Sequence, residues 1–438
     1  MAEPVRAGTV AGLDAALPED EAGASLEAAR VLSDLDELAA ISDPGPGVTR
    51  VAYTQRDAEG RAWFARRCDE LGLRFEVDSH GNCFGWSPGC DERPAVLVGS
   101  HLDSVREAGS YDGVLGVVVG FEIARRALTR DPGAPVAVVS FACEESTRFG
   151  IGTVGSRLLF GDLDGGALED LRDLDGTPLR EVLSGAGLDP AASSTFDPDG
   201  IAAFVEVHVD QGSGLGDTGT VGVVPAIAGC IRTRISWRGE ASHSGAHARS
   251  QRRNALLGAA RFIVAAEDLW SEIDARGESA TVTIGWLENR PNAPNSVVGT
   301  TDVVVDLRSP DAAVLTATEE ALERIARDVG AEGGLGVDVK TLGRIEPVEM
   351  SAAVVGILRE SARDAEVDHR LFPSMAGHDT EVLAHRIPSA MLFVANPAGV
   401  SHNPAEAISR ESLAGALTML DRALPELFVM RATRLEGE

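Results

Sequence analysis

Three apolar runs rich in β-branched residues constrain the fold of this chain more than any other feature. They are Ala95–Ser100, Val136–Phe141 and Phe204–Val209. Each run is nearly continuously apolar, which is typical of strands that are buried on both faces of a sheet. Helix-like segments, such as Gly113–Arg130, separate the runs. The pattern therefore predicts a mostly parallel α/β sheet flanked by helices, with a further strand at Ala390–Ala395.

A different order of elements follows Gly229. The hydrophobic pattern predicts strand, helix, strand, strand, helix and strand at Ile231–Trp237, Arg252–Trp270, Thr281–Leu287, Asp302–Leu307, Ala312–Val329 and Gly336–Thr341. This βαββαβ order is that of a ferredoxin-like α+β domain. The α/β pattern resumes near Ser351. We therefore expect a discontinuous catalytic domain, residues 1–228 and 346–438, with an inserted domain at 229–345.

The size and charge of the chain limit its class. At 438 residues it exceeds the length at which single cores stop growing, as expected for two domains. A formal net charge of −29 disfavours nucleic acid and anionic membranes as partners, because like charges repel. The first residues lack the positive flank and apolar stretch of a signal peptide, so we expect a cytoplasmic protein.

Polar side chains lie at the carboxyl ends of the predicted strands. His101 follows the first run and His208 closes the third. Glu144 and Glu145 follow the second run, and His402 lies beyond the last strand. Because the carboxyl ends of parallel strands meet at one edge of a sheet, we expect these groups to converge. Imidazoles and carboxylates bind zinc, manganese, cobalt or nickel, whereas the five cysteines form no CxxC pair.

The spacing of these groups fits a dinuclear metal site. Two ions about 3.5 to 4 Å apart need a bridging carboxylate, and Asp112, on a turn at a helix start, is suited to bridge. The expected terminal ligands are His101, Glu145, His208 and His402. Adjacent side chains point in different directions, so Glu144 stays free to act as a general base. Asp103 is expected to accept the N–H of a ligand histidine.

Short motifs with these residues follow one another along the chain. They read GSHLDSV, YDGVLGV, FACEESTRFG, EVHVDQG, GEASHSG, PNAPNSVVG, DLRSP, AGHDT and GVSHNPAE. In this order they resemble the zinc-dependent amidase/hydantoinase/carbamoylase branch of the M20 metallopeptidase superfamily. That branch includes N-carbamoyl-L-amino-acid hydrolase, β-ureidopropionase and allantoate amidohydrolase. The resemblance extends over most of the chain and covers both expected domains.

The resemblance implies a metal content and a ligand set. Two divalent ions per subunit are expected, zinc as the first choice and manganese, cobalt or nickel as alternatives. Their implied ligands are His101, Asp112, Glu145, His208 and His402. Glu144 is implied as the base, and a cis peptide bond is expected between Asp112 and Gly113.

The resemblance also implies a role for the inserted domain, as a lid and dimerisation domain of a homodimer. His243 would polarise the scissile carbonyl in the active site of the partner subunit. Asn295 and Arg308 would hold the substrate carboxylate, and Gln211 and His378 would add contacts to the substrate. Domain closure would bring the lid residues onto the substrate.

The expected activity is metal-dependent cleavage of the carbamoyl C–N bond in a small carboxylate-bearing ureido compound, with release of ammonia. N-carbamoyl amino acids, N-carbamoyl-β-alanine, allantoate and ureidoglycolate stay open as substrates. One alternative is an M20-type amidase acting on peptides or N-acyl amino acids. Another is a metal-free binding protein with the same two-domain clamp.

Overall fold

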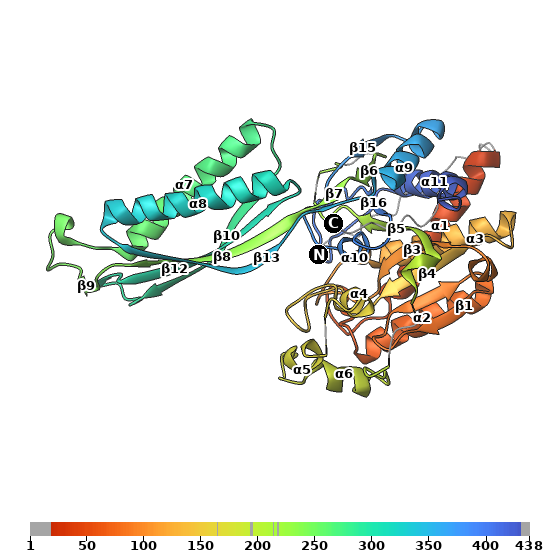
Figure 1. Cartoon of the computed structure of the whole chain (residues 1–438), viewed down its shortest axis with the longest axis horizontal. Helices are drawn as coiled ribbons and strands as arrows, with labels where there is room; N and C mark the ends of the chain where they lie inside the picture. Colours follow the sequence, from red (N-terminus) through yellow and green to blue (C-terminus); the bar gives the residue numbers. More distant parts are fainter. Residues whose placement is uncertain (1–18, 164, 193–195, 213, 217–218, 431–438) are drawn as a thin grey trace, which may run out of the picture.

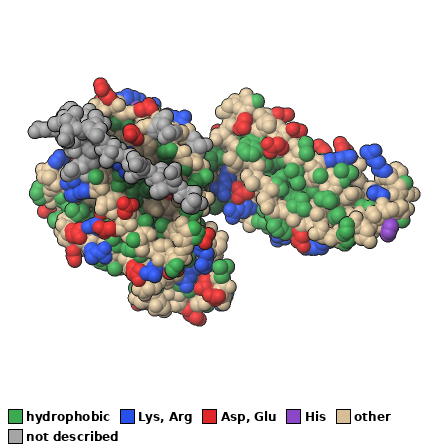
Figure 2. All heavy atoms as spheres, turned by 180° about the vertical axis from the view of Figure 1, so that it is seen from behind, with side chains coloured by type: hydrophobic (Ala, Val, Ile, Leu, Met, Phe, Trp, Pro, Cys, Tyr) green, Lys and Arg blue, Asp and Glu red, His purple; other side chains and the backbone are tan. Residues whose placement is uncertain are grey.

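The protein is described by a computed structural model that covers residues 19–163, 165–192, 196–212, 214–216 and 219–430. Two bodies joined by a narrow waist make up the molecule (Figures 1 and 2). The larger body contains an eight-stranded sheet and the smaller a four-stranded sheet. The strands of the smaller sheet begin at Gly229 and end at Ile345. We call this smaller body, residues 229–345, the inserted domain and the rest the main domain.

The large sheet has the strand order β1-β2-β4-β3-β5-β16-β6-β15. Its strands are β1 (Arg74–Val77), β2 (Cys83–Trp86), β3 (Ala95–His101), β4 (Val136–Phe141), β5 (Ile201–Val209), β6 (Val221–Val224), β15 (His369–Leu371) and β16 (Ser389–Val394). The central strands β4, β3, β5 and β16 are parallel to one another and buried along their whole length. Their carboxyl ends therefore lie at one edge of the sheet.

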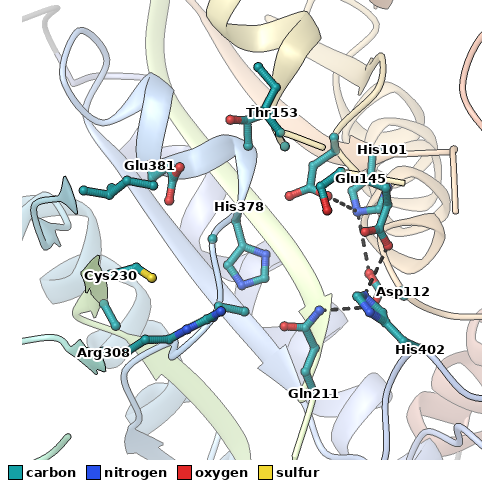
Figure 3. A pocket seen from close by; sticks show the side chains of 18 of the residues that line it. His101, Asp112, Glu145, Thr153, Gln211, Cys230, Arg308, His378, Glu381 and His402 are labelled. Atoms are coloured by element: carbon teal, nitrogen blue, oxygen red, sulfur yellow. Dashed lines mark hydrogen bonds and ion pairs between the residues drawn. The ribbon is translucent and has the colours of Figure 1, made fainter. Parts of the chain in front are cut away.

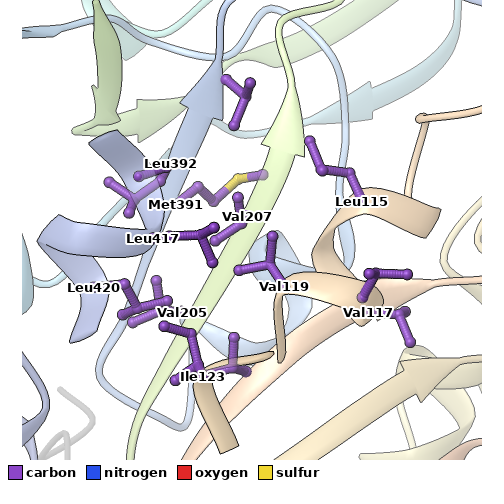
Figure 4. Packing of buried hydrophobic residues seen from close by; sticks show 14 of the residues in the cluster. Leu115, Val117, Val119, Ile123, Val205, Val207, Met391, Leu392, Leu417 and Leu420 are labelled. Atoms are coloured by element: carbon purple, nitrogen blue, oxygen red, sulfur yellow. The ribbon is translucent and has the colours of Figure 1, made fainter. Parts of the chain in front are cut away.

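Helices cover both faces of this sheet. The helices of the main domain are α1 (Glu19–Ala39), α2 (Gln55–Leu71), α3 (Val114–Arg130), α4 (Val154–Leu159), α5 (Ala167–Asp170), α6 (Leu179–Gly185), α9 (Ala352–Asp364), α10 (Asp379–Leu383) and α11 (Arg410–Leu427). The main core lies on the face covered by α1, α2, α3, α9 and α11. Figure 4 shows α3 and α11 packing their apolar side chains against β5 and β16. The shorter helices α4 and α10 close the opposite face with a second cluster.

The inserted domain has the expected ferredoxin-like order. It consists of β8 (Gly229–Arg238), α7 (Ala255–Ala275), β10 (Thr281–Arg290), β12 (Thr300–Ser309), α8 (Ala312–Gly333) and β13 (Gly336–Ile345). The strand order is β10-β12-β8-β13, and both helices pack on one face of this sheet around a core of their own. Helix α7 begins later than the expected Arg252, because the Asn254 side chain accepts the Leu257 N–H and caps the helix there.

Short elements complete the chain. They are the strands β7 (Ala226–Ile227), β9 (Ser242–His243), β11 (Ser296–Val297) and β14 (Val348–Glu349), and the 3₁₀ turns Pro88–Asp91, Pro198–Gly200 and Arg249–Gln251. The predicted fold class, a mostly parallel α/β sheet with a ferredoxin-like insertion, is confirmed by both sheet topologies. Among the helices described, none has the length and apolar character needed to cross a membrane.

Candidate metal centre

The polar groups at the strand ends form one buried cluster. His101 ends β3 and His208 lies in β5, beside Asp112 at the start of α3. Within the described residues, His101, Asp112 and His208 offer ligand atoms within 4.8 Å of one another. Asp112, Glu145 and His402 form a second such group. The two groups share Asp112, so the structure brings all five expected ligands together around it (Figure 3).

The two oxygens of Asp112 face different partners. Its Oδ1 lies 3.2 Å from His208 Nε2 and 3.6 Å from His101 Nε2. Its Oδ2 lies 3.3 Å from His402 Nε2, which is in turn 3.2 Å from Glu145 Oε1. A carboxylate that divides its oxygens between two ligand groups has the arrangement that a bridge between two metal ions requires.

Backbone carbonyls orient the two buried histidines. His101 Nδ1 lies 2.9 Å from the Asp103 carbonyl oxygen, and His208 Nδ1 lies 2.9 Å from the Val209 carbonyl oxygen. Because a carbonyl oxygen only accepts, each Nδ1 carries the proton and donates it. Each Nε2 therefore faces Asp112 and is the ring atom placed to bind a metal ion.

Asp103 acts through a different group from the one expected. Its backbone carbonyl binds His101, while its carboxylate lies 3.9 Å from His101 Nδ1. The carboxylate instead accepts the backbone N–H groups of Glu144 and Glu145, both at 3.1 Å. It therefore holds the turn that carries Glu144, whose Oε2 lies 3.6 Å from His101 Nε2.

The expected cis bond between Asp112 and Gly113 is wrong. In the described part of the chain, the one cis peptide is Arg290–Pro291. With a trans bond, the turn is made by the positive φ of Gly113, 69°, which directs its N–H at His208 Nε2 (3.1 Å). A Cβ at Gly113 would lie 2.3 Å from the His101 ring, so only glycine fits between the two ligands.

Sequence reasoning missed Glu406, which supports Asp112. One oxygen of Glu406 accepts the backbone N–H groups of Tyr111 (3.0 Å) and Asp112 (3.1 Å). The other accepts from Ser401 Oγ at 2.8 Å, and that hydroxyl lies 2.7 Å from Asp112 Oδ2. Glu406 belongs to the same short motif as His402, but its distance from Asp112 along the chain hides the contact.

The carboxylates and imidazoles of the cluster interact strongly with one another. Burial opposes the charged form of Asp112, yet the neighbouring histidines outweigh it and hold the Asp112 pKa well below its ordinary value. Hydrogen bonds that His402 donates to Asp112 and Glu145 raise the pKa of His402 to about 10. In the ranges that the structure covers, no lysine or arginine contacts Asp112 or Glu145. Imidazoles and carboxylates are ligand types that divalent metal ions bind, so the donor set fits such ions.

A cavity of about 360 Å³ opens from the cluster toward the inserted domain. Figure 3 shows the ligand residues on one side, Arg308 and Glu381 on the other, and His378 between them. Arg308 comes from β12, where Asp306 accepts from its Nε at 2.8 Å. Its Nη1 donates to the Met375 carbonyl at 2.9 Å, which ties the inserted domain to the main domain.

Gln211 and His378 also line this cavity. Gln211 Nε2 donates to Asp112 Oδ2 at 3.1 Å. His378 is buried and shares a 2.8 Å hydrogen bond with Ser374 Oγ. Burial, with His208 nearby, lowers the pKa of His378 well below its usual value, so this imidazole is neutral.

His243 and Asn295 do not line the cavity of their own subunit. His243 lies in β9, at the end of the inserted domain far from the main domain, and its side chain is exposed (Figure 1). Asn295 is exposed beside it, and its carbonyl accepts the Ser244 N–H at 2.9 Å. Neither residue therefore reaches the metal cluster within one chain.

Comparisons with known proteins agree over nearly the whole chain. The model of Peptidase family M20/M25/M40 matches residues 97–426. The N-carbamoyl-L-amino-acid amidohydrolase of Paenarthrobacter aurescens is 34% identical over 392 residues, 87% of this chain and 93% of that protein. The allantoate amidohydrolase of Escherichia coli is 33% identical over 392 residues, covering 88% and 94%.

A solved structure shows the same fold. The hydantoinase/carbamoylase family amidase from Burkholderia multivorans superposes with a TM-score of 0.81 at 30% identity, covering 93% of this chain and 98% of that one. The similarity extends over both domains. The chain belongs to the M20/M25/M40 peptidase family, among its hydantoinase/carbamoylase-type amidases, and is a hydrolase of amide C–N bonds.

Proposed function

We propose that the protein cleaves the carbamoyl C–N bond of an N-carbamoyl amino acid or a related ureido acid such as allantoate. One molecule of water is consumed, and an N-carbamoyl amino acid yields the amino acid, ammonia and carbon dioxide. The observation that carries the proposal is the cavity itself. It joins a cluster with a shared carboxylate, Asp112, to an arginine at its other end, Arg308.

The metal content is part of the proposal. Two divalent ions, zinc as the first choice, would be held by His101, Asp112, Glu145, His208 and His402, with Asp112 shared. Bound there, divalent ions lower the pKa of a water molecule and polarise a carbonyl oxygen.

Glu144 is the proposed general base. Burial, with the nearby Glu145, raises the Glu144 pKa well above its usual value, which makes its carboxylate a stronger proton acceptor than that of an exposed glutamate. The side chain is therefore suited to take a proton from the attacking water and to pass it to the leaving nitrogen. Asp103 holds the backbone of Glu144 in place during both transfers.

Substrate recognition is assigned to the far side of the cavity. Arg308 keeps its Nη2 free of the bonds to Asp306 and Met375, so it has donors left for a substrate carboxylate. Gln211 and the neutral His378 supply further polar contacts. His243 and Asn295 would reach the cavity from a partner subunit, which makes the proposed active form a homodimer.

Large apolar side chains are exposed on the inserted domain and support an interface there. They include Leu257 (48% exposed), Val264 (62%) and Trp286 (41%). Figure 2 shows hydrophobic side chains spread over one face of this domain. Exposed apolar side chains such as Leu257 and Val264, which both lie on α7, are typical of a contact surface.

A substrate screen tests the proposal. Purified protein loaded with zinc, manganese, cobalt or nickel is assayed for ammonia with N-carbamoyl amino acids, N-carbamoyl-β-alanine, allantoate and ureidoglycolate. N-acetyl and N-formyl amino acids are assayed in parallel for release of the free amine. Ammonia release from at least one ureido acid, exceeding turnover of the acyl compounds, is expected. Turnover of the acyl compounds alone would instead identify an N-acyl amino acid amidase.

A further inference from the structure

Two charged side chains on the main-domain wall of the cavity have no assigned role. Arg157 lies on α4 and Glu381 on α10, and both line the cavity. Among the described residues, no hydrogen bond or ion pair is formed by the Arg157 guanidinium. Arg308, in contrast, is held by Asp306 and by the Met375 carbonyl. Arg157 thus keeps its full set of donors for a ligand.

A buried hydrogen bond joins the two helices that carry these residues. Ser156 Oγ donates to Asp379 Oδ1 at 2.6 Å, and both side chains are fully buried. This bond joins α4 to α10 directly next to Arg157 and two residues before Glu381. A Cβ at Gly155 would lie 2.3 Å from the Ala142 carbonyl oxygen, so α4 also packs tightly on the end of β4.

The electrostatics agree with this geometry. Burial raises the pKa of Glu381 to about 7, while Arg157 and Arg308 both counteract that rise. The two guanidinium groups therefore lie close enough to act on the same carboxyl group. The far end of the cavity thus combines donors from Arg157 with acceptor oxygens from Glu381.

We propose that Arg157 and Glu381 determine specificity by binding an uncharged polar substituent, a carboxamide or a second ureido group, next to the scissile ureido group. Arg157 donates to the carbonyl oxygen of this substituent, and Glu381 accepts from its N–H. The inference rests on the proposed function and refines its substrate class. An apolar substituent would leave both charged side chains desolvated without partners, which is the costly case in substrate discrimination.

Substrates of nearly equal shape test the inference. They are the N-carbamoyl derivatives of asparagine, leucine and aspartate, whose side chains are polar, apolar and anionic at similar size. For the metal-loaded wild type, the kcat/KM for the asparagine derivative is expected to exceed that for the leucine derivative by about 10- to 100-fold. A preference for the leucine or the aspartate derivative would overturn the inference.

Substitutions at Arg157 and Glu381 test whether these residues cause the preference for the asparagine derivative. Arg157→Met should remove most of the asparagine-over-leucine ratio, whereas Arg66→Met, which removes an exposed arginine on α2, should leave the ratio unchanged. Glu381→Leu is the second, independent variant. It should lower kcat/KM for the asparagine derivative and raise it for the aspartate derivative, because a repelling carboxylate is lost. Equal losses on all three substrates would assign Arg157 to the common carboxylate and overturn the inference.

A substrate without a side chain distinguishes an error in the specificity role from an error in the proposed function. Ammonia release from N-carbamoylglycine, which lacks a side chain, reports the proposed function alone. If it is hydrolysed while the ratios do not respond to either variant, the specificity role is wrong and the function stands. If no ureido acid releases ammonia with any metal, both are wrong.

Discussion

At the scale of single residues, the adjacent glutamates Glu144 and Glu145 contact different partners. Glu145 contacts His402, whereas Glu144 contacts His101 and stays out of the group around Asp112 and His402. Asp103 serves both glutamates by accepting their backbone N–H groups. The backbone that carries both the proposed base, Glu144, and the proposed ligand, Glu145, is thus held by one buried carboxylate.

Glu144→Gln should keep the metal and lose turnover. The amide fills the same space but cannot accept the proton of the attacking water, so a drop in kcat of about 10²- to 10⁴-fold is expected. Metal content and steady-state kinetics of the purified variant check this. Glu92→Gln, at an exposed position, is the control. Near-normal kcat with full metal content would remove Glu144 from its role as base.

Glu381→Gln should change how stability depends on pH. Burial raises the pKa of Glu381 from its usual 4.5 to about 7, so the folded protein holds this proton more tightly than the unfolded chain. The contribution of this bound proton to the free energy of unfolding is fully present below pH 4.5 and is lost as the pH rises through 7. The Tm of the variant relative to wild type should therefore increase between pH 5 and pH 8. An equal Tm difference at both values would contradict the raised pKa.

At the scale of elements, the site depends on loops that meet from distant parts of the chain. The loop before α3 carries Asp112, and the loop after β16 carries Ser401, His402 and Glu406. Glu406 joins them through two backbone N–H groups and Ser401. The parallel order of β4, β3, β5 and β16 then brings the remaining groups to the same sheet edge.

Glu406→Ala should weaken metal binding without unfolding the protein. Loss of its bonds to the Asp112 loop frees the shared carboxylate, and changes to such supporting groups lower metal affinity by about 10- to 100-fold. Titration of the metal-free protein with zinc measures the change, with Glu426→Ala on the exposed side of α11 as control. Unchanged zinc affinity in a folded Glu406→Ala protein would show that the loop contact is dispensable.

At the scale of the whole molecule, the candidate metal ligands and some of the proposed substrate-binding residues lie in different domains. The metal cluster lies in the main domain, whereas His243 lies at the far end of the inserted domain (Figure 1). Only Arg308, near the waist, reaches the cavity of its own subunit from among the expected lid residues. This distance is the reason for placing His243 in the site of a partner.

Mixing two inactive variants tests that arrangement. If His243 acts across a dimer, a heterodimer of Glu144→Gln and His243→Ala subunits has one complete active site. Random pairing should then restore about a quarter of wild-type activity, whereas each variant alone stays inactive. Co-expression with two affinity tags, followed by ammonia assays, measures the recovery. Heterodimers without activity would place His243 outside the partner's site.

The sequence by itself determined the order of elements and the identity of the groups that converge. Continuous apolar runs identified the parallel strands, and the βαββαβ pattern identified the inserted domain, because burial and periodicity are local properties of the chain. His101, Asp112, Glu145, His208 and His402 could be selected because each follows a strand or begins a helix. Parallel strands then bring such positions together.

Tertiary structure alone decided how these groups are held. Three contacts join segments far apart in the chain: Glu406 binds the Asp112 loop, Asp103 binds the Glu144 turn, and Ser156 binds Asp379. The small space left beside the His101 ring accommodates only a glycine at position 113. Such contacts arise from packing and backbone hydrogen bonds between distant segments, which leave no periodic or compositional signal in a single sequence.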